Sequence, residues 1–445
     1  MGLEIESLTL LVESLRRLDG GFAELADFSP EIDLERMREV LEEVAFRMRD
    51  NFPYHHPLYA GQMLKPPHPI ARLAYCLALW INPNNHALDG GRASSAMEKE
   101  AVAELAKLFG WQRHLGHLTS GGTMANLEAL WVSGRLAPGK KVVASEQAHY
   151  THRRISEVLR LDFEAIPVDA RAKMDLRFLE KLLQSGEVGT VVATVGTTAS
   201  GSIDPLPQIF QLKQKYGFRL HVDAAYGGYF TLAENLTSEA RAAFDTLDKV
   251  DSIVVDPHKH GLQPYGCGSV LFRDPSVGAI YKHESPYTYF TSKELHLGEI
   301  SLECSRPGAS AVALWATQKL LPLKPSGEFA RALSSCRKAA LDLHNRLEND
   351  NRFLTLFPPE LDIVIWAVRA QDLSEISRLS RRFFNAAAQE NLHLALVELP
   401  LQLVEPYWKE VSLNRKYVTC LRSCLMKPEH QTWIDEIWSI LDRIN

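Results

Sequence analysis

The sequence predicts an α/β protein with a mostly parallel central sheet and a smaller α+β unit at the C-terminal end. Between residues 118 and 272, short apolar runs alternate with helical segments, as in a parallel sheet with helices on both faces. Polar residues directly follow several of these runs, where ligands bind in open α/β sheets. After Pro322-Leu-Lys-Pro325 the alternation gives way to longer helices and separate strands.

Composition limits the classes of function. The chain has 445 residues, 46% hydrophobic and 23% charged, enough for two or three structural units and a large core. A net charge of −6 without acidic or basic blocks argues against nucleic-acid and membrane-surface partners. We expect no secretory signal at the acidic N-terminus and no membrane span. The six scattered cysteines form no C-x-x-C pair, so we expect no metal site. We expect the cysteines to be free thiols in the cytoplasm.

Three parts of the chain differ in pattern. Residues 1–95 contain two helices with apolar stripes, the clearer one from Leu34 to Met48, and then a segment rich in proline and histidine that we expect to form a cleft wall. Such stripes are usually core, but here they could also pack on a partner subunit. We expect residues 96–322 to form a large ligand-binding domain and residues 323–445 a small C-terminal domain.

The expected elements follow from apolar periodicity and from residues that start or stop helices and strands. Helices are expected at residues 70–80, 96–109, 125–136, 174–185, 205–216, 308–321, 330–347 and 373–390. Strands are expected at residues 141–144, 190–195, 219–222, 250–255, 269–272, 361–368 and 392–397.

Lys259 follows the buried run Ile253-Val-Val255 and the strand stop at Asp256-Pro257. Taken alone, a lysine in such a loop is usually just solvated. Thr119-Ser-Gly-Gly-Thr123 precedes a helix and can bind an anion, because the glycines expose unpaired backbone N–H groups. Asp223 ends another strand as a partly buried carboxylate, and a buried carboxylate needs a cation or hydrogen-bond donors.

Small residues at Ala224 and Ala225 leave room for a flat group beside Asp223, and His149 could cover its other face. An anion site, a buried acid, a flat slot and a lysine together describe a pocket for pyridoxal 5'-phosphate. In such a pocket the acid holds the pyridinium proton and the lysine forms the Schiff base.

Four motifs occur in one order: Thr119-Ser-Gly-Gly-Thr-Met-Ala-Asn126, Thr194-Val-Gly-Thr-Thr198, His221-Val-Asp-Ala-Ala-Tyr-Gly-Gly228 and Asp256-Pro-His-Lys-His-Gly261. Together they resemble the group II pyridoxal-phosphate-dependent amino acid decarboxylases over roughly residues 50–320. Asn82-Pro-Asn-Asn-His86, the tyrosine-containing loop and Ser305-Arg-Pro-Gly308 are most similar to the microbial tyrosine decarboxylase branch. The resemblance implies an aspartate aminotransferase-like fold (fold type I) and a homodimer with shared active sites.

The resemblance also implies roles for individual residues. Lys259 would form the Schiff base, Asp223 would pair with the pyridine nitrogen, and His149 would stack on the ring. A loop tyrosine would protonate the α-carbon, Tyr287 by preference and Tyr289 as the reserve. The remaining cofactor contacts are expected from Gly122, Thr123, Thr197, Thr198, Ala225 and His258.

The implied reaction converts an L-amino acid to its amine and CO2, with an aromatic substrate such as tyrosine favoured. Alternatives are glutamate or aspartate decarboxylation, aldehyde synthesis, carbon–carbon lysis, and a catalytically silent dimer. His260 departs from the bulky aromatic residue that many relatives carry after the lysine, and its role stays open. In the expected cleft wall, Tyr54, His55, Tyr59, Gln62 and His86 would suit an aromatic substrate, and Lys65 and Arg92 an acidic one.

Overall fold

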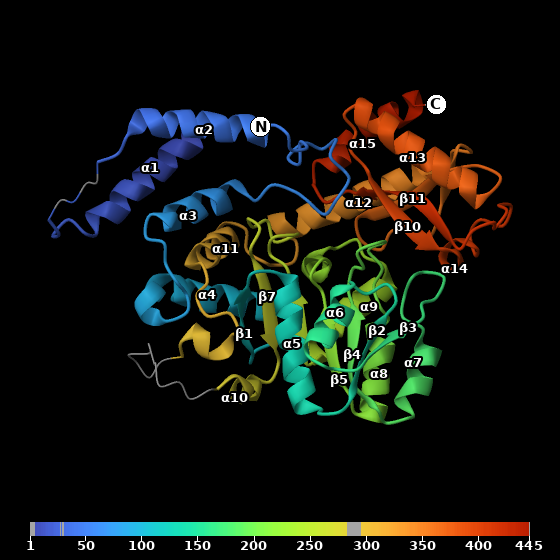
Figure 1. Ribbon diagram of the computed structural model, residues 1–445, viewed down its shortest axis with the longest axis horizontal. Coiled ribbons are helices and arrows are strands. Elements are labelled where there is room, and N and C mark those ends of the chain that lie inside the picture. Colours follow the sequence, from blue (N-terminus) through green and yellow to red (C-terminus); the bar gives the residue numbers. More distant parts are fainter. Residues whose placement is uncertain (1–4, 27, 29–30, 283–294, 445) are drawn as a thin grey trace.

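A seven-stranded sheet forms the centre of the computed structural model, which describes residues 5–26, 28, 31–282 and 295–444. The strand order is β1-β7-β6-β5-β4-β2-β3 (Figure 1). Strands β2 to β6 pair in parallel, and β7 runs antiparallel to β6 and β1, so the sheet is mostly parallel, as predicted. The strands are β1 (Leu115–Thr119), β2 (Lys141–Ser145), β3 (Phe163–Ile166), β4 (Val188–Thr194), β5 (Arg219–Asp223), β6 (Ser252–Val255) and β7 (Gly268–Phe272).

Helices connect and cover these strands. Their positions agree with the expected segments to within a few residues, except that α4 starts early and that α6, α9 and α10 were not expected. The helix α4 passes through the Asp89-Gly-Gly91 stretch that reads as a loop, because the chain bends at Gly91 and then continues as a helix. The helices are α3 (Pro69–Leu79), α4 (Leu88–Leu108), α5 (Gly122–Leu136), α6 (Thr151–Val158), α7 (Leu176–Leu183), α8 (Leu206–Tyr216), α9 (Ser238–Asp245), α10 (Gly278–Tyr281) and α11 (Gly308–Leu320).

A second, antiparallel sheet lies above the first one in Figure 1, with strand order β10-β11-β9-β8. Its strands are β8 (Phe353–Thr355), β9 (Ile363–Val368), β10 (Ala395–Pro400) and β11 (Tyr417–Cys424). The accompanying helices are α12 (Glu328–Glu348), α13 (Leu373–Gln389), α14 (Leu401–Val404) and α15 (His430–Arg443). The smaller C-terminal α+β part of the predicted fold is therefore confirmed. We propose that it forms a domain beginning at residue 323.

One hydrophobic core joins the two sheets. Its buried side chains come mainly from the seven-stranded sheet and its helices, for example Val191 and Ile209. Leu361, Ile363 and Met426 of the C-terminal part belong to the same cluster. Full burial of such a side chain stabilises a fold by about 1.5–3 kcal/mol. Because both sheets contribute to this core, it holds the polar strand ends between them in a fixed arrangement.

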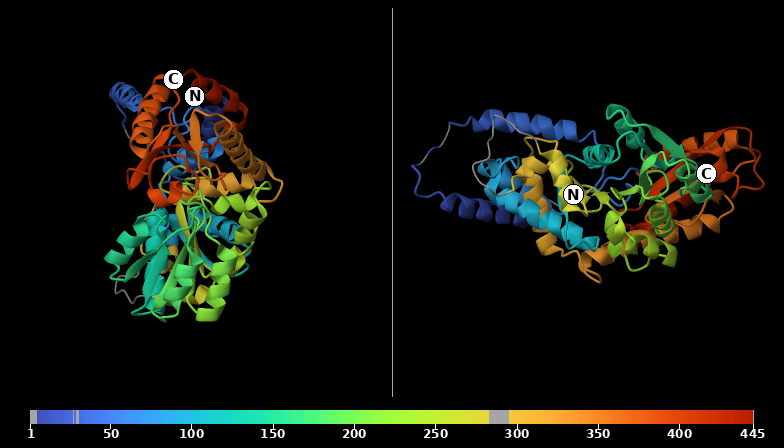
Figure 2. Two further views of the ribbon diagram at one scale, coloured as in Figure 1. Left: turned by 90° about the vertical axis from the view of Figure 1, so that its right-hand side faces the viewer. Right: turned by 90° about the horizontal axis from the view of Figure 1, so that it is seen from below.

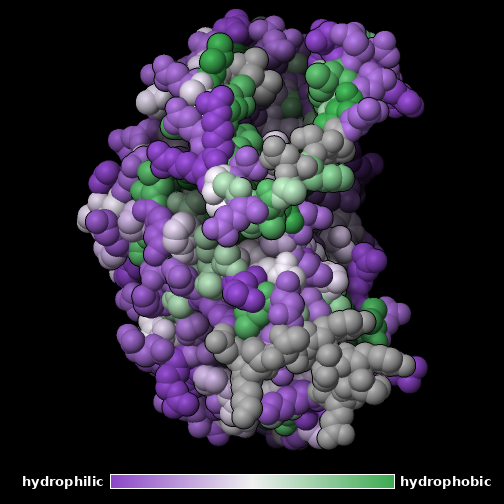
Figure 3. All heavy atoms as spheres, turned by 90° about the vertical axis from the view of Figure 1, so that its left-hand side faces the viewer, coloured by the Kyte–Doolittle hydropathy of each residue, from purple (hydrophilic) through white to green (hydrophobic). Residues whose placement is uncertain are grey.

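The first two helices, α1 (Ile5–Gly20) and α2 (Leu34–Met48), bury no residue. They project to one side of the molecule when it is seen from below (Figure 2). On the face that includes this side, green hydrophobic patches lie among purple polar residues (Figure 3). No helix in the described ranges combines the length and the apolar character needed to cross a membrane.

Candidate active site

A cleft of about 330 Å³ lies at the carboxyl ends of β4, β5 and β6 and at the start of α5. In a parallel sheet these strand ends share one edge, which explains why residues far apart in sequence meet here. The lining residues are Ser120, Gly121, Gly122, Thr123, Met124, Asn126, His149, Thr151, Thr194, Gly196, Thr198, Asp223, Ala225, Tyr226, Asp256, His258 and Lys259. The cleft therefore contains all the predicted site residues within the described ranges except Thr197.

The glycine-rich turn packs tightly against the loop that carries Lys259. A Cβ atom at Gly122 would lie 2.7 Å from Asp256 Oδ2, whereas one at Gly121 would meet His258 Cε1 at 3.4 Å. Only glycine fits at position 122 without displacing the carboxylate. The helix α5 begins at Gly122, and the first backbone N–H groups of a helix have no partner inside it, so this end of the cleft favours an anion.

Asp256 is the ionic partner of Lys259. Its Oδ2 atom lies 3.1 Å from Lys259 Nζ and 3.5 Å from His258 Nε2. The carboxylate is buried, while Lys259 is partly exposed to the cleft. The His258 ring stacks on Tyr265 with 4.7 Å between ring centroids, and burial lowers the pKa of His258. A neutral, stacked imidazole thus flanks the lysine on its cleft side.

Asp223 ends β5 and is held by donors on three sides. Its Oδ2 atom accepts from His152 Nε2 at 2.8 Å and from Asn126 Nδ2 at 3.4 Å, and its Oδ1 atom accepts from the Ala225 amide at 3.1 Å. Burial alone would raise the pKa of Asp223, but the hydrogen bond and charge of His152, with the charge of Lys259, lower it below its usual range. The carboxylate is therefore ionised.

His152 was missed by the sequence reasoning, because it lies inside α6, a short helix that was not expected. The only signal in the sequence was its spacing of three residues from His149. A second polar layer was missed as well: His221 contacts Ser252 Oγ at 2.8 Å and Asn126 Oδ1 at 2.9 Å. This buried chain of polar groups fixes the Asn126 amide next to Asp223.

His149 lies half-buried between β2 and α6 and lines the cleft. Its Nδ1 atom lies 2.8 Å from Thr151 Oγ1, which sets the orientation of the ring. Burial lowers the pKa of His149, so that the imidazole is neutral near pH 7. A neutral, oriented ring can stack on a flat ligand.

The two threonines of the Gly196-Thr-Thr198 turn behave differently. Thr198 lines the cleft, but the Thr197 hydroxyl lies 2.9 Å from Ser200 Oγ and is buried within the turn. The prediction that Thr197 contacts the ligand thus has no support from the geometry. Arg422 of β11 donates to the Thr198 carbonyl oxygen at 2.9 Å and to Gln62 Oε1 at 2.7 Å, which brings a guanidinium to this wall.

Tyr287 and Tyr289, the two predicted proton donors, lie outside the described residues.

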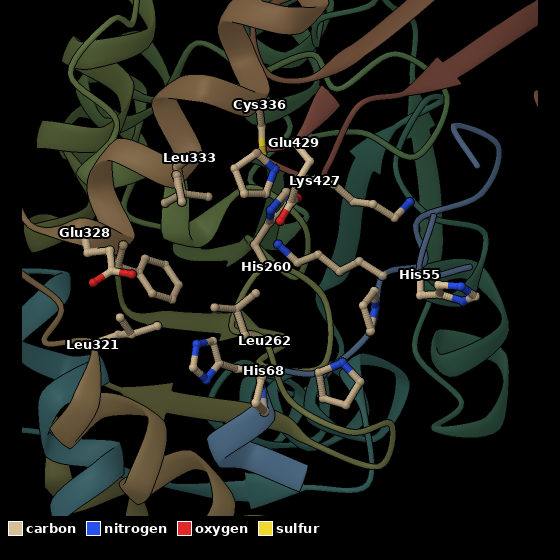
Figure 4. Close-up of a pocket in the computed structure, with 17 residues that line it drawn as sticks. His55, His68, His260, Leu262, Leu321, Glu328, Leu333, Cys336, Lys427 and Glu429 are labelled. Atoms are coloured by element: carbon tan, nitrogen blue, oxygen red, sulfur yellow. The ribbon is translucent and has the colours of Figure 1, made fainter. Parts of the chain in front are cut away.

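His260 turns away from the cleft into a second cavity of about 300 Å³, on which Lys65, Cys336 and Lys427 also border (Figure 4). Its Nε2 atom lies 3.2 Å from Asp362 Oδ2, and Asp362 Oδ1 accepts from the Tyr226 hydroxyl at 2.6 Å. All three groups are buried. His260 therefore packs the Lys259 loop against the C-terminal part and does not contact the space in front of Lys259.

The expected cleft wall is divided between several places. His55 and Lys65 border the second cavity, and Arg92 is exposed on α4. Tyr54 and Tyr59 pack against each other with 4.9 Å between ring centroids. Gln62 reaches the cleft region through its contact with Arg422.

Comparisons with known proteins agree with this geometry. The family model "Pyridoxal-dependent decarboxylase conserved domain" matches residues 31–369. The L-tyrosine decarboxylase of Enterococcus faecium is 28% identical over an alignment of 466 positions, gaps included, that spans 80% of this chain and 76% of that protein. The L-aspartate decarboxylase of Thermococcus kodakarensis is 32% identical over 286 residues, which cover 64% of this chain and 73% of that protein.

Solved structures show the same fold. Mouse CSAD superposes with a TM-score of 0.79 at 20% identity, covering 97% of this chain and 91% of that chain. Oryza sativa TDC with PLP and tryptamine superposes with a TM-score of 0.78 at 16% identity, covering 100% of both chains. The fold class predicted from the sequence is therefore confirmed as that of the fold type I decarboxylases.

The cleft has what a pyridoxal phosphate cofactor requires. A glycine turn at a helix start can bind the phosphate, an ionised Asp223 can pair with the ring nitrogen, and Lys259 can carry the aldehyde carbon. With the family match over residues 31–369, these features show that the chain belongs to the pyridoxal-dependent decarboxylase family and is a pyridoxal-phosphate-dependent amino acid decarboxylase.

Proposed function

We propose that the enzyme decarboxylates an L-amino acid at Lys259, with an aromatic substrate such as tyrosine favoured. The observation that carries this proposal is the meeting of Lys259, Asp223, His149 and the glycine turn in one cleft. The Enterococcus faecium relative, which spans 80% of this chain and is named an L-tyrosine decarboxylase, supports an aromatic substrate.

Each residue has a role that follows from its surroundings. Lys259 would be the residue that joins the cofactor, and Asp256, 3.1 Å from Nζ, holds its amine in place. Gly122, Thr123 and His258 would hold the phosphate at the start of α5. Asp223 would pair with the ring nitrogen, and Ala225 and His149 would contact the ring.

When bound, pyridoxal phosphate supplies the electron sink for the pair left by the broken carbon–carboxylate bond. Asp223 would keep a proton on the ring nitrogen, because its carboxylate is ionised and buried. CO2 leaves, and the α-carbon then needs a proton, which we assign to Tyr287 with Tyr289 as the reserve. The neutral His149, which lines the cleft, would cover the reacting group and limit the access of water.

Arg422 is the candidate that binds a carboxylate of the substrate. It is buried, its Nε atom has no hydrogen-bond partner among the described residues, and no described carboxylate forms an ion pair with it. A buried guanidinium without an anion is costly, so an anionic ligand beside Thr198 would stabilise it. This observation also favours a second candidate function, aspartate decarboxylation, which the name of the Thermococcus kodakarensis relative supports.

Substitution of Arg422 by methionine separates the two readings. If Arg422 binds the α-carboxylate, kcat/KM falls for every amino acid, by about 30-fold or more for a lost buried charge pair. If Arg422 binds a side-chain carboxylate, only aspartate or glutamate turnover falls. The control is Arg381→Met, which removes an exposed guanidinium on α13, outside the cleft.

The test of the function is a screen of the twenty amino acids for CO2 and amine release with added pyridoxal phosphate. We expect tyrosine to be turned over, and Lys259→Ala to lose both turnover and the visible absorption band of the bound cofactor. A screen in which no amino acid releases CO2, together with a wild-type protein that binds no cofactor, would contradict the proposal.

We also propose a homodimer with shared active sites, located in the cytoplasm. Five apolar side chains of α2, namely Leu34, Met37, Val40, Leu41 and Val44, are between 47% and 69% exposed, and a second copy would cover them. The six cysteines are free, which suits a reducing compartment.

A further inference from the structure

His152 is a fully buried histidine whose side chain has one polar contact among the described residues, with the carboxylate of Asp223 in the cleft. It lies in the first turn of α6 at 0% exposure, and its Nε2 atom is 2.8 Å from Asp223 Oδ2. Its Nδ1 atom is buried without a hydrogen-bond partner in the described part of the chain. By contrast, the neighbouring His221 uses both ring nitrogens.

This arrangement costs stability. A buried ring nitrogen without a partner costs about 1–3 kcal/mol, and a leucine or phenylalanine at this site would avoid that cost. In the described part of the chain, the contact of Nε2 with Asp223 is the only side-chain polar interaction that offsets this cost. The histidine is therefore explained by what it does to Asp223 and not by the packing of α6.

The acceptor positions of Asp223 show what this effect is. An ionised carboxylate has about four acceptor positions. His152 and Asn126 occupy both positions of Oδ2, and the Ala225 amide occupies one of Oδ1. One position on Oδ1 stays open. His152 thus fixes the orientation of the carboxylate. If the group rotated, Oδ2 would leave the two donors that it now accepts from, and the open acceptor position of Oδ1 would point elsewhere.

We propose that His152 is a positioning residue for the cofactor: it holds Asp223 ionised and oriented, with one acceptor position open for the ring nitrogen. This rests on the proposed role of Asp223. The direction of the Asp223 pKa agrees, since His152 is the first contribution that opposes the effect of burial. His149 lies on the same segment and also lines the cleft. Residues 149–152 therefore both border the cleft and orient Asp223.

A matched pair of amides tests the proposal. In His152→Gln the amide nitrogen reaches about as far as Nε2 and can still donate to Asp223, whereas in His152→Asn it falls short. Cofactor affinity is measured by titrating the cofactor-free dimer or monomer with pyridoxal phosphate and following tryptophan fluorescence. The pH dependence of the visible band of the bound cofactor is the second readout.

We expect the glutamine variant to stay within about 3-fold of the wild-type Kd, and the asparagine variant to bind about 10-fold or more weakly, with a displaced pH dependence of the band. Ile155→Val, a buried change on the same helix that does not touch the cleft, controls for general loosening of α6. A merely structural role would lower the Tm of both amide variants without separating their Kd values or moving the pH dependence, and that result would overturn the proposal. A wild-type protein that binds no cofactor would instead overturn the proposed function.

Discussion

Replacement of Gly122 by alanine tests how tightly the cofactor turn packs on the lysine loop. The new Cβ atom would lie 2.7 Å and 2.9 Å from the two carboxylate oxygens of Asp256, well inside the 3.4 Å at which ordinary van der Waals contact begins. Asp256 cannot move freely, because it is buried and pairs with Lys259 and His258.

Overpacking of this kind costs about 1–3 kcal/mol, while a glycine-to-alanine change in a helix otherwise stabilises by about 0.5–1 kcal/mol. We therefore expect a net loss of about 1–2 kcal/mol, seen as a lower Tm of the cofactor-free protein in calorimetry. Affinity for pyridoxal phosphate should fall as well, because the displaced carboxylate no longer holds Lys259.

The adjacent Gly121→Ala is the matched control, since its Cβ atom would meet His258 at an ordinary 3.4 Å and its backbone is extended. We expect its Tm to stay close to that of the wild type. A Gly122→Ala protein as stable as the control, or more stable, would refute the reasoning, because the intrinsic preference of a helix for alanine would then be the larger effect.

Three further predictions concern the proposed proton donor, a buried histidine and the proposed dimer. In Tyr287→Phe we expect amine formation to fall by about 10²-fold or more, as for the loss of a general acid. If aldehyde and peroxide appear instead, with oxygen consumed, this tyrosine decides between decarboxylation and aldehyde synthesis. Burial, with the nearby charge of His152, lowers the pKa of His221 to about 3, so the unfolded chain binds the extra proton below pH 6.5. Stability is then lost as the pH falls from 6.5, by about 2 kcal/mol at pH 5, and Tm against pH should be flatter in His221→Gln. A double change of Leu41 and Val44 to aspartate should convert the proposed dimer to a monomer in light scattering, whereas an unchanged mass would place the interface elsewhere.

Most of the large sheet could be predicted because its strands are continuous apolar runs between helices with clear start and stop residues. The helix expected at residues 174–185, for example, is observed as α7, which Asp175 caps by accepting from the amides of Arg177 and Phe178. The strand β11 could not be recognised, because it is buried on both faces yet contains Thr419, Arg422 and Ser423. Their hydrogen bonds make them compatible with burial, and those partners lie far away in the sequence.

The candidate site could be predicted wherever a motif brings its own chemistry, as with Lys259 and Asp223. It could not be predicted where a residue acts through a partner on another element. His152, Arg422 and the Asp256 contact with Gly122 belong to this second group. The role of His260 stayed open in the sequence because it adjoins Lys259, but consecutive side chains point in different directions, and its ring pairs with Asp362.

Asp256 explains why the motif around Lys259 and the glycine motif occur together. Its buried carboxylate requires a cation, which Lys259 provides, and it occupies the space that a side chain at position 122 would need. The effects of Gly122→Ala and Asp256→Ala on stability should therefore not add. Removing the carboxylate frees the space for the new methyl group, so we expect a coupling free energy of about 0.5–3 kcal/mol in a double-mutant cycle. If the two effects add, the glycine motif and the motif around Lys259 do not depend on each other for stability. Their joint occurrence would then be explained by the cofactor alone, which each motif contacts independently.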